Sequence, residues 1–142
     1  MNSNAYEPPG SPAAAGYAHG APNRTLLVLA AVGAWLASAY WAALTLLLGF
    51  GVASGTVSGT RIFLPGVLIA LYAWRGVQLF KGDAAAARRI LWLHGAGGAI
   101  ALFQMISGGG PLLMALQGIK VAIHVFGLVT AYLAMQSVAR PR

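Results

Sequence analysis

The sequence predicts an all-α integral membrane protein, built as a bundle of four transmembrane helices. Of its 142 residues, 58% are hydrophobic and only 8% are charged. Soluble domains carry about 25% charged residues, so this chain could not cover a soluble globule with polar side chains. The apolar residues fall into four blocks separated by short polar breaks, and each block is long enough to cross a bilayer. A single membrane domain spanning residues 24–137 is therefore expected.

Residues 1–23 consist mainly of Pro, Gly, Ala, Ser and Asn and show no hydrophobic period, which predicts a disordered tail. The tail begins Asn4-Ala5-Tyr6-Glu7-Pro8-Pro9. This start resembles the Asn-Pro-Tyr-x-x-Pro openings of many small bacterial inner-membrane proteins, with Ala5 in place of their first proline. The resemblance implies a bacterial origin and a cytoplasmic N-terminus, and it implies nothing about the fold.

The first span is predicted at about 25–51. Small residues recur at every fourth position in it, which allows another helix backbone to approach closely; they are Ala30, Ala34, Ser38 and Ala42. The following stretch, 51–59, repeats glycine at the same spacing. Its Gly, Ser and Thr content favours a loop over an extension of the helix.

The second span is predicted at 62–80, with Pro65 in its first turn, where the missing N–H costs little. Lys81-Gly82-Asp83 then separates two helices. Gly82 is suited to end the second helix in the left-handed conformation, and Asp83 is suited to cap the third.

The third span has its apolar part at 90–106, preceded by alanines that favour helix. The stretch Ser107 to Gly110 ends it, and Pro111 opens the fourth span, 112–135. So short a connection predicts that the last two helices form an antiparallel hairpin. Residues 138–142 are expected to form a short cytoplasmic tail.

The basic residues predict the orientation, with both termini in the cytoplasm (N-in/C-in). Arg61 alone lies on one side of the four predicted spans. The other side receives Arg24, Lys81, Arg88, Arg89, Arg140 and Arg142. Cytoplasmic loops collect positive charge, so the second side is the cytoplasmic one. The same rule accounts for the net charge of +7 without a nucleic-acid partner.

The residue types exclude several kinds of chemistry. The chain has no cysteine, and its two carboxylates, Glu7 and Asp83, lie outside the apolar blocks. Disulfides, thiol chemistry and a pair of catalytic carboxylates within the membrane are thereby excluded. No nucleophile–base pair, phosphate loop or metal-ligand cluster is recognisable. We therefore expect no enzyme activity, no catalytic residue and no metal site.

A polar face on the fourth span is the most unusual feature of the sequence. Gln117, Lys120 and His124 share one helical face, and Gln104 lies at similar depth on the third span. Lys120 lies ~13 Å from the outer edge of the span, and no carboxylate of the chain can reach it. Three interpretations stay open: an internal polar cluster, a docking site for a partner's carboxylate, and a transport or ligand site. The internal cluster would include contacts of Lys120 with Thr45 or Tyr72 and a Gln104–Gln117 bond.

Three arginines are candidates for contact with anionic lipid or a partner: Arg75, Arg88 and Arg89. Arg75 lies about five residues inside the second span, and its side chain is long enough to reach the headgroups.

His94 and His124 are weak candidates for haem ligands. Counted from the predicted cytoplasmic edges, they differ in depth by ~10 Å, which disfavours one haem between them. No cofactor is therefore expected, although a haem shared between copies or held by one histidine stays open. The glycines after His94 allow close helix approach or leave room for a flat cofactor.

These features together predict a small bacterial inner-membrane protein that is a non-enzymatic accessory or scaffold subunit. Its expected partners are membrane lipids and another membrane subunit or further copies of itself. The alternative is an oligomeric small-molecule transporter or channel, and a weaker alternative is a haem-binding redox subunit.

Overall fold

The computed structural model describes residues 22–107 and 110–139. Within these ranges the chain is helical and contains no strand. Its elements are α1 (Arg24–Ala53), η1 (Gly59–Ile62), α2 (Phe63–Phe80), α3 (Ala84–Ile106) and α4 (Pro111–Ala139). By length and composition, α1, η1 together with α2, α3, and α4 could each cross a membrane. The prediction of an all-α protein with four apolar spans is confirmed.

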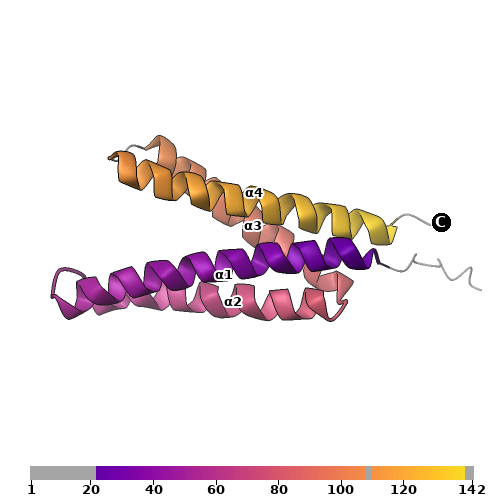
Figure 1. Ribbon diagram of the computed structural model, residues 1–142, viewed down its shortest axis with the longest axis horizontal. Coiled ribbons are helices and arrows are strands. Elements are labelled where there is room, and N and C mark those ends of the chain that lie inside the picture. The colour runs from indigo at the N-terminus through magenta and orange to yellow at the C-terminus, as the bar shows by residue number, and fades with distance from the viewer. Residues whose placement is uncertain (1–21, 108–109, 140–142) are drawn as a thin grey trace, which may run out of the picture.

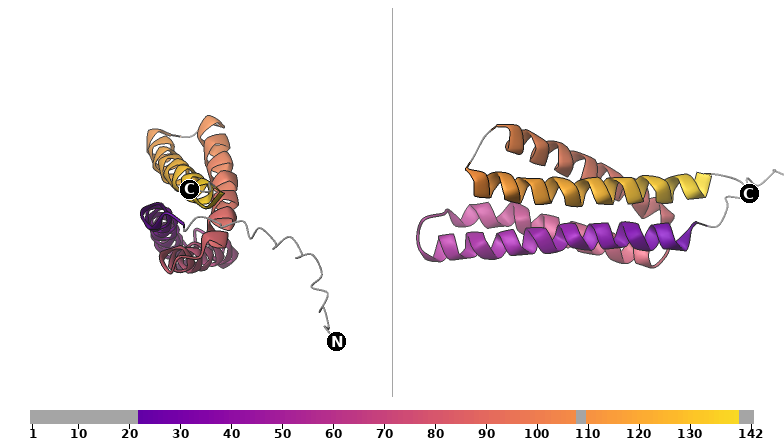
Figure 2. Two further views of the ribbon diagram at one scale, coloured as in Figure 1. Left: turned by 90° about the vertical axis from the view of Figure 1, so that its right-hand side faces the viewer. Right: turned by 45° about the horizontal axis from the view of Figure 1, so that its top comes forward.

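The four helices form two antiparallel hairpins, α1–α2 and α3–α4, that meet mainly through α1 and α4 (Figure 1). Helices α2 and α3 touch little, although only three residues separate them. The start of α1, the α2–α3 connection and the end of α4 lie together at what we call the terminal end. The opposite, loop end carries the α1–η1 and α3–α4 connections. The hairpins lie closest at the terminal end and separate toward the loop end, as both views of Figure 2 also show.

The hydrophobic core lies toward the terminal end and is built largely from alanine. Every buried residue of α1 falls between Leu27 and Ala37, so the second half of this helix contributes none. Small side chains let helix backbones approach closely where lipid offers no hydrophobic driving force. The core consists of Leu27, Ala30, Ala31, Ala34, Ala37, Tyr72, Leu79, Ala86, Ala87, Ile90, Ala131 and Ala134.

Short polar side chains begin two of the helices. Asn23 Oδ1 accepts hydrogen bonds from the Thr25 and Leu26 amides at 3.0 and 3.3 Å. At α3, Asp83 Oδ1 accepts from the amides of Ala85 and Ala86, and Gly82 before it has φ of 96°. The predicted sequence of a left-handed glycine followed by a carboxylate cap is confirmed.

The helix ends differ from the predicted span edges. Helix α1 continues through Gly51 to Ala53, and only then does the chain turn. The Gly51 carbonyl accepts from the amides of Thr56 and Val57, which closes this turn. Helix α3 starts at Ala84, ahead of its apolar part, as the Asp83 cap and the alanines after it predict.

Several predicted features lie partly outside the described residues. These are the 1–23 tail, of which residues 22 and 23 are described, and the side chains of Arg140 and Arg142. The predicted 138–142 tail overlaps α4, which continues to Ala139. Arg24, Lys81, Arg88 and Arg89 lie at the terminal end, and Arg61 lies at the loop end.

Candidate functional site

Two histidines from different helices meet in the middle of the second hairpin. Nδ1 of His94 on α3 lies 3.1 Å from Nδ1 of His124 on α4, within hydrogen-bond distance. Their ring centroids are 5.3 Å apart, in an edge-to-face arrangement. The side chains are 1% and 2% exposed, so the pair is buried within the protein.

Glycines on the facing helices make room for the two rings. The ring of His94 occupies the space that a Cβ at Gly127 would fill, and the ring of His124 does the same at Gly97. On both helices the glycine follows the histidine by three residues, so each helix supplies one ring and one gap. This reciprocal packing holds α3 and α4 close together and fixes where the imidazoles face each other.

Gly127 also lies against the first hairpin. A Cβ built at Gly33 of α1 would lie 2.8 Å from the Gly127 Cα atom. Helices α1, α3 and α4 therefore all pack at this one residue, and the histidine pair lies beside their meeting point.

The predicted depth mismatch between the two histidines is wrong. His94 lies 12 residues before the end of α3, and His124 lies 13 residues after the start of α4. Because the short connection fixes the two helices against each other at that end, both residues reach nearly the same height. The sequence-based estimate counted from the apolar edges at residues 90 and 135, and α3 in fact begins six residues before the first of them.

A third ring closes the site from α2. The Tyr72 ring centroid lies 5.1 Å from that of His94 and 6.0 Å from that of His124. Its hydroxyl donates a 3.0 Å hydrogen bond to the Leu93 carbonyl oxygen on α3. The sequence placed Tyr72 near Lys120 and gave no signal for this contact, which depends on how α2 is rotated against α3.

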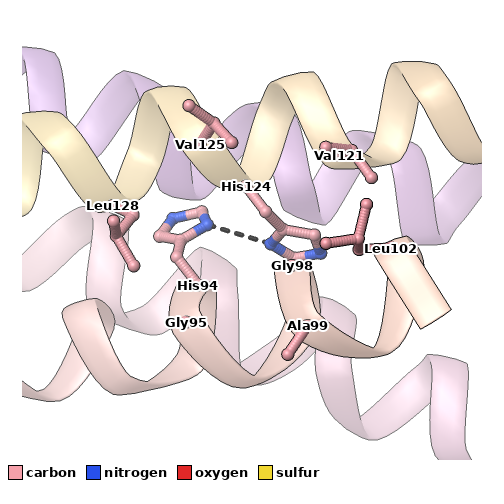
Figure 3. Close-up of a pocket in the computed structure, with 9 residues that line it drawn as sticks. All are labelled: His94, Gly95, Gly98, Ala99, Leu102, Val121, His124, Val125 and Leu128. Atoms are coloured by element: carbon pink, nitrogen blue, oxygen red, sulfur yellow. Dashed lines mark hydrogen bonds between the residues drawn. The ribbon is translucent and has the colours of Figure 1, made fainter.

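A cavity of about 210 Å³ adjoins the histidine pair (Figure 3). It lies between α3 and α4, and its walls are apolar apart from the two imidazoles. Ala99, Leu102 and Val125 in these walls are exposed, so the cavity opens on the outer face of the hairpin. The lining residues are His94, Gly95, Gly98, Ala99, Leu102, Val121, His124, Val125 and Leu128.

Neither known family models, nor curated proteins, nor solved structures give a match to this chain. Its chemistry is therefore inferred from its own geometry.

The geometry does not fit a haem held between the two histidines of one chain. Imidazole–metal bonds are about 2.0 Å long, so two nitrogens on opposite sides of one metal lie about 4 Å apart. Here the facing nitrogens are 3.1 Å apart, and the glycine contacts hold the helices too close for a macrocycle to pass between the rings. The obstacle is the close packing of α3 on α4 rather than a difference in depth. Among the described residues, no group of three metal-ligating side chains occurs either.

Lys120 has two neutral neighbours within its own chain. Its Nζ donates to Gln104 Oε1 at 3.3 Å and lies 4.7 Å from the centre of the Trp41 ring. Helical side chains lean toward the helix N-terminus, so the ammonium group reaches toward the loop end, where Gln104 lies near the end of α3. The side chain is 5% exposed. The sequence gives no signal for Trp41 as a neighbour of Lys120, because this contact depends on how α1 and α4 are rotated against each other.

The other contacts expected around Lys120 do not form. The Tyr72 hydroxyl is bound to Leu93, and the Thr45 hydroxyl donates to the Trp41 carbonyl at 2.7 Å. No Gln104–Gln117 bond is present among the described residues; Gln117 Oε1 is buried without a hydrogen-bond partner there. Lys120 competes successfully for the Gln104 oxygen because a cation is the stronger donor.

The candidate lipid-contacting arginines differ in their surroundings. Arg75 is half-buried, and its Nη1 donates to Gln78 Oε1, one turn nearer the terminal end, at 2.6 Å. Arg88 and Arg89 are exposed in the first turns of α3. Contact of these three with lipid or a partner stays a prediction.

Proposed function

We propose that this chain is a non-enzymatic accessory or scaffold subunit of a bacterial inner membrane, which associates with another membrane protein through helix–helix contacts. The proposal rests on the loop-end half of the bundle, where the two hairpins separate. Its large side chains there are open to the surroundings: Phe50, Phe63, Ile106 and Leu112 are each at least 75% exposed.

The main support for the proposal is a set of glycines in the same half on which no other helix of the described structure packs. At Gly49 of α1, Gly66 of α2 and Gly118 of α4, the position a Cβ would take has no atom of another part of the described structure within 4 Å. Glycines in membrane helices allow another backbone to approach closely, and these three have no such neighbour among residues 22–107 and 110–139. Gly33 and Gly127, by contrast, are already used for internal packing. We infer that the helices of a partner pack against the free glycines.

The surroundings of Lys120 favour a partner contact made by helix packing rather than by charge pairing. Its ammonium group already has the Gln104 oxygen and the Trp41 ring as neighbours within the chain, so the proposed contact does not use a partner's carboxylate. A partner that recognises the loop-end glycines can therefore be apolar at the contact.

The decisive experiment is affinity purification after crosslinking in the native membrane. We expect a foreign membrane protein in a fixed ratio to this chain. The double variant Gly66→Leu/Gly118→Leu should lose it, because each new side chain occupies the space for the partner's backbone. Ala96→Leu is the matched control, since Ala96 is also exposed on a membrane helix but is not one of the free glycines. Retention of the partner by the double variant would refute this contact, and a homo-oligomer without a foreign subunit would favour the transporter or channel.

The proposed orientation places the terminal end in the cytoplasm. Among the residues that the structure describes, Arg24, Lys81, Arg88 and Arg89 lie at that end, and Arg61 lies at the loop end. The chain has no cysteine, so single cysteines can be introduced and labelled. In intact cells, a membrane-impermeant thiol reagent should label Ser58→Cys and leave Ala85→Cys unlabelled. Labelling of Ala85→Cys alone would reverse the orientation.

A further inference from the structure

The hydrogen bond between the histidines determines which nitrogen of His124 carries a proton. His94 Nε2 is buried against Gly127 and has no hydrogen-bond partner among the described residues. In either tautomer one outer N–H of the pair has no acceptor among the described residues: that of His94 Nε2, which is packed against Gly127, or that of His124 Nε2, which faces the cavity. Only the second can receive an acceptor, from an occupant of the cavity, and native proteins rarely tolerate a buried N–H without one. We therefore assign the shared proton to His94 Nδ1, so His124 accepts at Nδ1 and carries its own proton on Nε2.

The resulting N–H of His124 has no acceptor among the described residues. The second nitrogen of its ring lies away from His94, on the side of Gly98 and Leu102 in the cavity wall (Figure 3). The cavity opens on the outer face of the hairpin, and near the middle of a membrane-spanning helix that face meets hydrocarbon, which offers this donor no acceptor. Apart from the two imidazoles, the walls offer a water molecule no polar partner. The missing acceptor therefore has to come from an occupant of the cavity.

The position of the cavity restricts that occupant to molecules that dissolve in hydrocarbon. His94 and His124 both lie near the middle of their helices, ~15–23 Å from either helix end at the rise of an α-helix. The ester carbonyls of phospholipids lie at the edges of a hydrocarbon core about 30 Å thick, and so do not reach this depth. A membrane-dissolved molecule that carries an oxygen on an otherwise apolar body can reach this depth and supply the acceptor.

The size and shape of the cavity favour a flat ring. An apolar protein cavity of about 150 Å³ is known to bind benzene, so 210 Å³ leaves room for a substituted six-membered ring. Gly95, Gly98 and Ala99 form one wall along α3, where the lack of side chains leaves a flat surface. The exposed Leu102 and Val125 border the opening, through which a hydrocarbon tail can pass into lipid.

We propose that this cavity binds the headgroup of a membrane-dissolved quinone, with one carbonyl oxygen accepting a hydrogen bond from His124 Nε2. The site is independent of the partner contact at the loop end, because its residues lie near the middle of α3 and α4. The proposal concerns binding alone.

The test measures quinone bound to the immobilised, detergent-solubilised full chain, with a decyl-tailed ubiquinone as the probe. Saturable binding of one quinone per chain is expected. Ala99→Leu should weaken binding at least about tenfold, because the added side chain fills the cavity. Ala96→Leu is the matched control on the same helix, outside the cavity lining, and should bind within about twofold of the wild-type chain.

A second probe tests the hydrogen bond without altering the protein. It carries the same decyl tail on a ring with methyl groups in place of both carbonyl oxygens. Its affinity for the wild-type chain should be about tenfold lower, because the His124 N–H then stays without an acceptor. Equal affinity for the two probes would overturn the quinone assignment and indicate an apolar occupant such as an acyl chain. Quinone uptake that does not saturate, or that is equal in the wild-type chain, Ala99→Leu and Ala96→Leu, would overturn the site itself.

Discussion

The contact between Gly33 and Gly127 offers the most direct test of how the two hairpins are joined. In Gly33→Ala, the new Cβ would lie 2.8 Å from the Gly127 Cα atom, which is too close for two carbon atoms. The obstacle is backbone, so no rotamer change relieves the overlap and α1 must move away from α4. Overpacking of this kind costs about 1–3 kcal/mol. Alanine in place of glycine within a helix returns up to about 1 kcal/mol, so the expected net loss is about 1 kcal/mol.

Gly118→Ala is the matched control for this prediction. It makes the same chemical change within a membrane-spanning helix, at a position that no neighbouring helix in the described part of the chain approaches within 4 Å. Only the helix-propensity gain applies there, so this variant should be more stable than the wild-type chain by up to about 1 kcal/mol. The two variants should therefore differ by about 2 kcal/mol, which is better determined than either value alone.

The assay is reversible unfolding in mixed micelles with increasing denaturing detergent, followed by far-UV circular dichroism and tryptophan fluorescence. Gly33→Ala should unfold at lower detergent fraction than wild type, and Gly118→Ala at equal or higher fraction. If both variants are stabilised to the same extent, α1 and α4 do not cross in contact at Gly33, and the arrangement of the hairpins described here is wrong. Gly127→Ala should be more damaging than Gly33→Ala, because it also displaces the ring of His94.

Three further predictions concern a helix cap, Lys120 and haem. Asp83→Ala should lower the free energy of unfolding by about 1 kcal/mol in the same assay, because two amides of α3 lose their acceptor. Asp83→Asn should keep most of the stability, and equal losses in the two variants would argue against the cap. Lys120→Met should be as stable as the wild-type chain or more stable, because an apolar side chain of similar length replaces a costly buried ammonium group. If the variant instead loses a protein that co-purifies with the wild-type chain, Lys120 pairs with that partner. Protein expressed with ample haem should show no Soret absorption after purification. A Soret band that disappears in both His94→Ala and His124→Ala would contradict the packing argument against a haem between these residues.

The four apolar spans and several helix boundaries follow from local features of the sequence, whereas the ends of α1 and α4 lie beyond the predicted span edges. The four apolar blocks predict four spans because only a helix satisfies its own backbone hydrogen bonds in lipid. Gly82, Asp83 and Pro111 mark helix boundaries through conformational preferences and capping bonds that involve only the nearest residues. The short 107–110 connection likewise predicts an antiparallel hairpin, because four residues can only join two helix ends that lie next to each other.

Only the tertiary structure decided which side chains meet. The sequence contains both His94 and His124, but their distance depends on the register of α3 against α4. That register is fixed by the hairpin connection and by the reciprocal contacts with Gly97 and Gly127, and the apolar edges used in the sequence-based estimate do not determine it.

The same limit applies to Lys120. Its neighbours Trp41 and Gln104 come from α1 and α3, and their approach depends on the rotation of three helices about their axes. A hydropathy pattern in lipid gives little information on rotation, because apolar side chains face both the lipid and the core. The partners of the buried polar groups, and the cavity beside His124, therefore follow from helix packing at glycine rather than from any pattern along the chain.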